Sequence, residues 1–162
     1  MGGGKGHELA NFHKAHPDIP GRLILQDLPI VLDKVRDNPS QDIELMNYDF
    51  FTPQPVKGAR AYYFRAVCHD WSDKECQKFL SNTAQAMVKG YSRILIDEYV
   101  IPNTGAPVRG SSMDFQMMVY LCGIERTRRQ WQSLLDACGL EILKIWGGRS
   151  DYEQIIEAQV KE

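Results

Sequence analysis

The chain has 162 residues, of which 25% are charged and 43% hydrophobic, and its formal net charge is -2. This is the composition of an ordinary globular protein, which excludes a disordered or fibrous chain. Lysine and arginine are spread along the sequence, so neither nucleic acid nor an anionic membrane surface is an expected partner. No apolar run is long enough to span a membrane, and no signal sequence is recognisable. We therefore expect a cytoplasmic protein with residues 1–162 in one domain.

The cysteines give no sign of a metal site or a disulfide framework. They contain no CxxC pair, and they lie inside or beside apolar segments: Cys68, Cys76, Cys122 and Cys138. We expect reduced, buried thiols and no bound metal.

A glycine-rich run opens the chain, at Gly2, Gly3, Gly4 and Gly6, and a segment of helical period follows it. Backbone N–H groups in such a loop can approach a ligand without obstruction from side chains. The run matches neither the phosphate-binding P-loop nor the dinucleotide fingerprint. On its own it leaves a cofactor loop and a flexible linker equally open.

Further along, short aliphatic runs alternate with longer segments of helical period, which is typical of an α/β sheet. Strands are predicted over residues 22–26, 43–48, 62–68, 93–100, 140–146 and 152–160. Helices are predicted over residues 73–89, 113–121 and 127–137. Ser72 and Glu75 have the spacing of a capping box, and Thr127 begins a second one. The apolar side chains of the 113–121 helix leave core packing and a substrate pocket both open.

Polar residues gather where the predicted strands end: Asp27, Asp49, His69 and Glu98. In an open α/β sheet the ligand binds outside the carboxyl ends of the strands, so these four residues are expected along one edge. Each acid taken singly is as well explained as a turn former or helix cap. Four such residues in register favour a site.

Several motifs, in this order, resemble the plant and fungal class I O-methyltransferases that act on phenols and polyketides. They are GGGKG before His7, Asp27-Leu28-Pro29, FRAVC running into HDWSD at residues 64–73, IDEYVIP at 96–102, and Glu125-Arg126-Thr127 before Trp131. The HDWSD segment is the most specific. The resemblance implies a Rossmann-like methyltransferase sheet flanked by helices, S-adenosylmethionine (SAM) as cofactor, and a phenolic or polyketide acceptor.

The resemblance also implies roles for residues of the reaction. His69 matches the family's general base, and Glu98 and Glu125 match the carboxylates that orient its ring. An imidazole titrates near neutrality and can accept a phenolic proton when a carboxylate holds its other nitrogen. The sulfonium already activates the methyl group, so no metal is expected.

On the cofactor side, the resemblance places Gly2 against the methionine part of SAM and Asp27 on the ribose hydroxyls. Asp49 and Phe50 would hold the adenine. Arg65 stands where the family usually has a lysine near the cofactor, which keeps the charge but changes its shape.

The chain departs from the family pattern at its beginning. The family's glycine loop follows an apolar strand, whereas here Met1 directly precedes Gly2. We therefore expect an N-terminally truncated sheet that lacks its first, central strand, and a missing N-terminal domain that in the family forms the homodimer. Because that domain helps to exclude water from the acceptor, we expect the 162 residues alone to be a poor catalyst.

Two other functions stay open. One is a SAM-binding scaffold that catalyses a rearrangement or cyclisation, like a pericyclase, instead of methyl transfer. The other is an inactive truncated homologue that acts as a binding partner.

Overall fold

The structure is a computed structural model that describes residues 1–35, 42–147 and 151–161. The chain divides into two compact units, Met1–Thr52 and Pro53–Glu162, and each is described by itself. That residues 1–162 form one SAM-binding domain stays a prediction. Among the described residues, no helix has the length and apolar character needed to cross a membrane.

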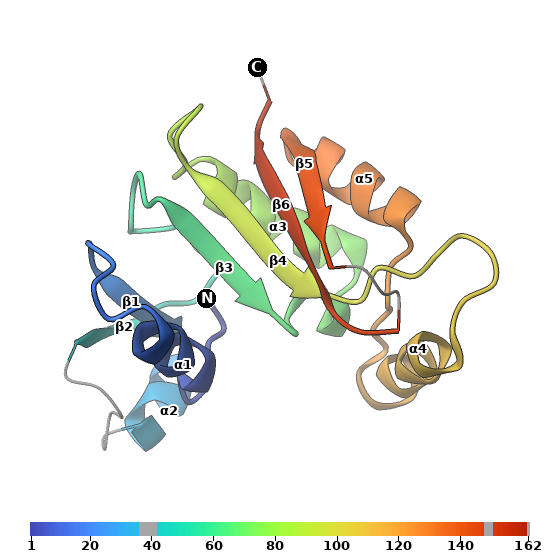
Figure 1. Cartoon of the computed structure of the whole chain (residues 1–162), viewed down its shortest axis with the longest axis horizontal. Coiled ribbons are helices and arrows are strands. Elements are labelled where there is room, and N and C mark those ends of the chain that lie inside the picture. The colour runs from blue at the N-terminus through green and yellow to red at the C-terminus, as the bar shows by residue number, and fades with distance from the viewer. Residues whose placement is uncertain (36–41, 148–150, 162) are drawn as a thin grey trace. The chain divides into compact units, whose positions relative to one another are not determined.

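The first unit is a parallel strand pair with helices (Figure 1). Its elements are α1 (His7–Ala15), β1 (Leu23–Asp27), α2 (Pro29–Leu32), the 3-10 helix η1 (Asp33–Val35) and β2 (Ile43–Asn47). β1 and β2 run parallel, with Leu23 opposite Ile43 and Asp27 opposite Asn47. Leu25, Leu32 and Ile43 form its buried core.

The second unit contains a four-stranded sheet. Its strands are β3 (Ala61–Arg65), β4 (Arg93–Glu98), β5 (Leu140–Trp146) and β6 (Gln154–Val160). Their order is β3-β4-β6-β5, in which β3 and β4 are parallel and β6 is antiparallel to both β4 and β5. Its helices are the 3-10 helix η2 (Cys68–Asp70), α3 (Asp73–Ala84), α4 (Val108–Leu121) and α5 (Arg128–Ala137).

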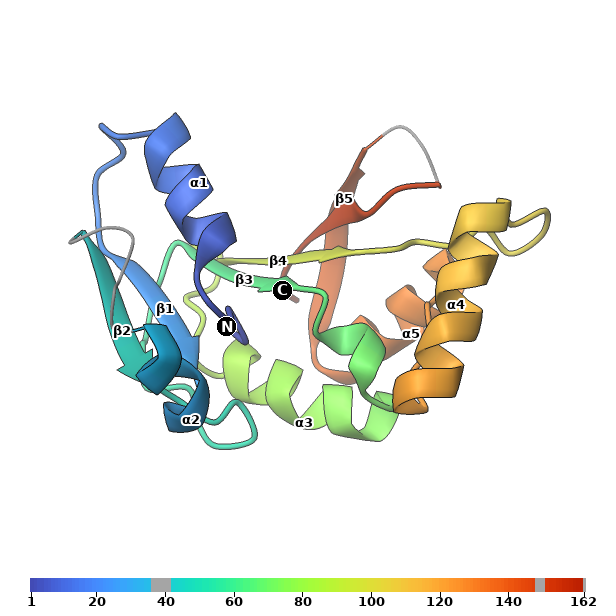
Figure 2. The ribbon, with the colours of Figure 1, turned by 90° about the horizontal axis from the view of Figure 1, so that it is seen from below.

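Helices α3 and α5 lie side by side on one face of this sheet (Figure 2). Alternate residues of β4 are buried, including Ile94 and Ile96, as expected for a strand with a covered face. The rings of Phe64 on β3 and Phe79 on α3 lie 5.6 Å apart. Figure 1 shows α4 beyond the carboxyl end of β4, where it packs against η2.

The predicted α/β architecture is confirmed, with one two-stranded and one four-stranded sheet in the part of the chain that the structure describes. The strand predicted over 140–146 is present with those bounds. The strand predicted over 62–68 is wrong at its end, because Ala66 has φ 49° and turns the chain into η2. The sequence reading missed α2 and η1.

The helix predictions need three corrections. The helix predicted over 73–89 ends at Ala84, where 3-10 hydrogen bonds such as Ala86 N–H to Thr83 O replace the α-helical pattern. The helix predicted over 113–121 begins earlier, at Val108. It is also largely exposed, so it is not a core helix, and Cys122 after it is exposed where a buried thiol was expected.

Only one of the two predicted capping boxes forms. The Thr127 hydroxyl accepts from the Gln130 backbone N–H, and the Gln130 side chain accepts from the Thr127 N–H. The Ser72 hydroxyl instead donates to the Glu75 carboxylate, so neither side chain caps the backbone of α3.

Candidate active site

Three segments of the second unit bring His69, Glu98 and Glu125 together. His69 lies in η2, Glu98 ends β4, and Glu125 lies just before α5. The Nδ1 atom of His69 is 2.8 Å from Oε1 of Glu125 and 3.3 Å from Oε2 of Glu98. The geometry thus gives one ring nitrogen two carboxylate neighbours, as the resemblance implied.

Both carboxylates are buried, and each keeps one oxygen without a hydrogen bond. The side chains of Glu98 and Glu125 are 1% and 0% exposed, and that of His69 is 12% exposed. Oε2 of Glu98 and Oε2 of Glu125 accept no hydrogen bond among the described residues. Buried acceptors of this kind are costly, so the site holds more negative charge than a single imidazole can satisfy.

This charge shows in the pKa values. Burial alone would lower the pKa of His69, but the hydrogen bond to Glu125 and the charge of Glu98 outweigh it and raise the pKa from 6.5 to about 9. Burial raises the pKa of Glu98 from 4.5 to about 7, against the opposing charge of His69. In the free site, the ring is therefore mostly protonated at neutral pH.

The other ring nitrogen of His69 lies near an acid that was not predicted as a site residue from the sequence. Nε2 of His69 lies 3.4 Å from Oδ1 of Asp70. Burial raises the pKa of the Asp70 carboxyl, and the charge of His69 opposes this shift. Asp70 is thus the neighbour of the nitrogen that remains for a substrate, and its place in HDWSD was the available signal.

Backbone hydrogen bonds fix these side chains. Oε1 of Glu98 accepts from the N–H groups of Val67 at 2.9 Å and Cys68 at 2.7 Å, directly before His69. The Glu125 N–H donates to Oδ1 of Asp114 on α4 at 2.8 Å. Asp114 was not predicted as a site residue, and no motif in the sequence pointed to it.

A tight backbone contact joins the Glu125 segment to the histidine turn. The Ile124 N–H donates to the His69 carbonyl at 2.9 Å. A Cβ atom on Gly123 would lie 2.0 Å from that carbonyl oxygen. Only glycine allows the two segments to approach this closely.

One nitrogen and two carboxylate oxygens of the His69, Glu98 and Glu125 cluster lie within 4.8 Å of one another. Imidazole with carboxylates is a ligand set that divalent cations accept. The site therefore has the donors for a metal, and the expected metal independence stays a prediction.

In the first unit, the glycine loop packs tightly on β1. The Gly4 N–H donates to Oδ2 of Asp27 at 2.8 Å, and the Gly3 N–H donates to the Gln26 carbonyl. A Cβ atom on Gly3 would lie 2.3 Å from Cδ1 of Leu25. Gly2 and Gly4 have positive φ angles of 59° and 55°. The run is therefore an ordered loop against the strand that ends in Asp27.

Asp27 and Asp49 lie at the same edge of the parallel pair. Asp27 ends β1 opposite Asn47, and Asp49 follows two residues later. Asp49 is exposed and accepts from the Phe51 N–H in a turn, and the half-buried Phe50 beside it contacts the Phe51 ring edge-on. A carboxylate and a ring at a strand end suit a nucleoside.

Arg65 ends β3, but acids of its own unit hold its guanidinium. Nε lies 3.2 Å from Oδ2 of Asp97, and Nη2 lies 3.9 Å from Oε1 of Glu153. The side chain is 38% exposed. A cofactor contact by Arg65 stays a prediction.

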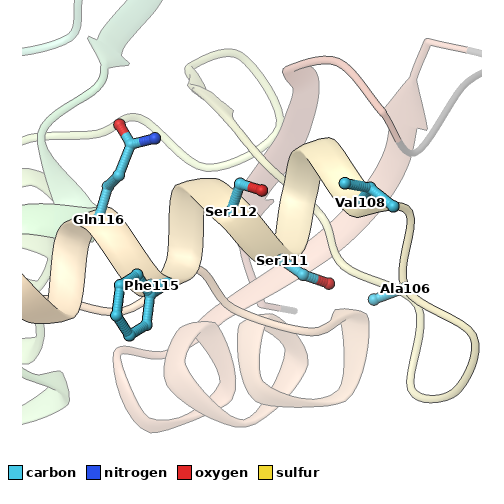
Figure 3. Close-up of a pocket in the computed structure, with 6 residues that line it drawn as sticks. All are labelled: Ala106, Val108, Ser111, Ser112, Phe115 and Gln116. Carbon is cyan, nitrogen blue, oxygen red and sulfur yellow. The ribbon is translucent and has the colours of Figure 1, made fainter.

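A shallow hollow of about 540 Å³ lies on α4 and the loop before it (Figure 3). Its lining combines small polar and apolar side chains: Ala106, Val108, Ser111, Ser112, Phe115 and Gln116. None of the three clustered residues lines it. The hollow is therefore separate from the His69 cluster, and the exposed Phe115 belongs to its lining.

Residues 1–141 match the family model described as the O-methyltransferase domain. The chain belongs to the O-methyltransferase family. This agrees with the sequence motifs and with the mixed α/β fold.

Two curated relatives of this O-methyltransferase chain illustrate the match. Methyltransferase cfoC of Aspergillus candidus is 44% identical over 157 residues, which is 97% of this chain and 39% of that protein. Demethylsterigmatocystin 6-O-methyltransferase of Emericella nidulans is 44% identical over 144 residues, which is 89% of this chain and 69% of that protein. The chain spans about two fifths of the length of cfoC.

Solved structures of similar fold include LepI in complex with SAM and a pericyclic reaction enzyme. Each has a TM-score of 0.93 and 36% identity to this O-methyltransferase chain, over 99% of this chain and 42% of the other. The family fold is thus shared by proteins of more than one reaction class.

Proposed function

We propose that the chain is the SAM-binding part of an enzyme that transfers a methyl group from SAM to a hydroxyl of an aromatic or polyketide small molecule. The observation that carries this is the pairing of His69 Nδ1 with Glu125 at 2.8 Å, which leaves Nε2 to take the hydroxyl proton. The name of the Emericella relative, which gives demethylsterigmatocystin as its acceptor, supports the acceptor class.

His69 acts as the general base. Its Nε2 accepts the proton as the acceptor oxygen becomes the nucleophile, and Glu98 and Glu125 hold the ring and stabilise the imidazolium. When bound, SAM supplies a methyl group on a cationic sulfonium, so the O–C bond forms as the C–S bond breaks and S-adenosylhomocysteine leaves. A pKa of about 9 makes His69 a stronger base than an ordinary histidine.

The cofactor residues of the first unit are Gly2, Asp27, Asp49 and Phe50. The glycine loop is held against β1, because the Gly3 and Gly4 N–H groups donate to Gln26 and Asp27 and a Cβ atom on Gly3 would overlap Leu25. Asp27 would take the ribose hydroxyls, and Asp49 with Phe50 would take the adenine. Arg65 would contribute positive charge from the end of β3. In the longer proteins of this family type, we expect a homodimer.

A second candidate is a rearrangement or cyclisation with SAM bound but not consumed. Two observations favour it: a pericyclic reaction enzyme shares the fold with a TM-score of 0.93, and the neighbouring acids keep His69 protonated at neutral pH by raising its pKa to about 9 against the effect of burial. An imidazolium can donate a hydrogen bond to a substrate carbonyl and polarise it. The intact set of His69, Glu98 and Glu125 favours methyl transfer over this candidate.

The test is a SAM titration of the 162-residue chain, followed by an assay with phenolic acceptors. We expect SAM binding, slow release of S-adenosylhomocysteine, and loss of that release in His69→Gln. His16→Gln changes an exposed histidine and should leave the rate unchanged. Binding with product formation but no S-adenosylhomocysteine would favour the second candidate. A chain that binds no SAM would support only a binding-partner role.

A further inference from the structure

Arg126, next to Glu125, has a charged side chain with 0% exposure. The general-base role proposed for His69 does not explain why this cation is buried there. Nε donates to Oδ1 of Asp73 at 2.8 Å, Nη1 donates to the Cys68 carbonyl at 2.8 Å, and Nη2 donates to the Trp71 carbonyl at 2.8 Å. Its guanidinium also lies over the Trp131 ring, 5.3 Å from the centroid. The two carbonyls bracket His69 and Asp70 in η2.

The turn that carries His69 has little hydrogen bonding of its own. Its internal bonds are long, at 3.2 Å from the Asp70 N–H and 3.3 Å from the Trp71 N–H, as is usual for a short 3-10 segment. Glu98 binds the N–H groups on one side of the turn. Arg126 binds the carbonyl groups on the other side. The carboxyl group of Glu98 and the guanidinium of Arg126 thus hold the backbone of η2 between them.

The segment that carries Arg126 is itself anchored. The Ile101 N–H donates to the Arg126 carbonyl at 3.0 Å, and the Arg128 N–H donates to the Ile101 carbonyl at 3.3 Å. Consecutive side chains of this extended segment take different targets. Glu125 reaches the ring of His69, and Arg126 reaches the backbone on either side of it.

We propose that Arg126 is a positioning residue that sets the His69 ring against its two carboxylates by fixing the carbonyls of Cys68 and Trp71. Its consequence for catalysis rests on the proposed function, but the positioning itself is measurable without any reaction. The rigid, planar fork of the guanidinium matches three separate acceptors, which a lysine ammonium on a flexible stem cannot do.

The test is Arg126→Lys in the full chain, which keeps the charge and removes the fork. The ring titration of His69 is followed by NMR and assigned with His69→Gln. Glu98, Glu125 and Asp70 are the titratable groups that face the ring, and a ring that moves away from them loses the interactions that raise its pKa. We expect the pKa of His69 to fall by about one unit or more toward 6.5. Arg129→Lys, at an exposed arginine of α5, should change nothing.

A role through charge alone predicts no change in Arg126→Lys and a raised pKa of His69 in Arg126→Met, because a cation has been removed. A folded Arg126→Lys chain with the wild-type titration would overturn the proposal. If Arg126→Lys does not fold, Asp73→Glu decides, since it keeps the negative charge but moves the carboxylate that binds Nε, and so displaces the guanidinium from the two carbonyls. A lowered pKa of His69 in Asp73→Glu supports the proposal, and an unchanged one refutes it.

A second experiment compares kcat and KM of the Arg126→Lys variant with those of the wild type, in a chain that transfers methyl groups. Misplacement of a base lowers kcat by about tenfold or more and leaves the KM for SAM unchanged. A chain without methyl transfer contradicts the proposed function only, because the titration still reports on Arg126.

Discussion

Nδ1 of His69 lies 2.8 Å from Oε1 of Glu125, although 56 residues separate the two along the chain. Because the acid is fully buried, water screens this contact little, and the protonated ring is favoured. The pKa of His69 thus depends on the position of Glu125, so a titration of His69 reports directly on the geometry of the site.

Glu125→Gln is expected to lower the pKa of His69. The substitution keeps the shape of the side chain but removes its charge and its strongest acceptor, so the pKa should fall from about 9 by at least about one unit. The ring titration by NMR measures this. Glu141→Gln, which lies on β5, serves as the control. An unchanged His69 titration would mean that Glu125 does not govern the ring.

The rate of methyl transfer is expected to rise with pH. A general base acts only in its neutral form, and a pKa of about 9 leaves roughly 1% of the His69 rings neutral at pH 7. The profile of kcat/KM should therefore climb through pH 7 to 9, and in Glu125→Gln its midpoint should move to lower pH. A flat profile over this range would exclude His69 as the proton acceptor.

Stability should change with pH in the opposite direction. The pKa values of Glu98 and His69 are both raised in the folded chain, from 4.5 to about 7 and from 6.5 to about 9. Between pH 4.5 and about 9 the folded chain thus binds more protons at these groups than the unfolded chain, and the free energy of unfolding falls as pH rises.

The expected fall is about 3 kcal/mol from each of the two groups, or roughly 7 kcal/mol across this window. Urea denaturation at a series of pH values measures it. The double variant His69→Gln with Glu98→Gln should show a flatter dependence. A double variant that loses stability with pH as steeply as the wild type would show that other groups dominate.

The sequence predicted the presence of the helices and strands better than it predicted the residues at which they end. The runs at Leu140–Trp146 and Ile43–Asn47 have simple periodicity, so their strands lie where expected, within a residue. The strand before His69 was extended too far because the apolar pattern continues through Val67 and Cys68. Those residues are buried in a turn, and burial without a strand leaves the same pattern in the sequence.

The candidate site was predictable only where a motif carried it. The HDWSD context singled out His69, and the resemblance supplied Glu98 and Glu125, whose roles stay predictions. Asp114 and Arg126 act on the backbone from distant segments, and neither spacing nor periodicity reports such contacts. The ion pairs that hold Arg65 were equally invisible in the sequence.

Gly123→Ala is expected to destabilise the second unit, because the added methyl would overlap the His69 carbonyl oxygen at 2.0 Å and contact Asp70 Cα at 3.3 Å. Both obstacles are backbone atoms, so neither can rotate away, and a cost of about 3 kcal/mol is expected. Urea denaturation measures it.

Gly105→Ala separates this clash from the general cost of replacing a glycine. Gly105 has φ 67° and no atom within 4 Å of its added Cβ, so only backbone strain of about 1 kcal/mol is expected there. The Ile124 N–H bond to His69 should also weaken in Gly123→Ala, because the two segments must part to make room for the methyl. Faster exchange of the Ile124 amide in Gly123→Ala than in Gly105→Ala would show this. Equal costs and equal exchange in the two variants would contradict a close approach of the Gly123 segment to the histidine turn.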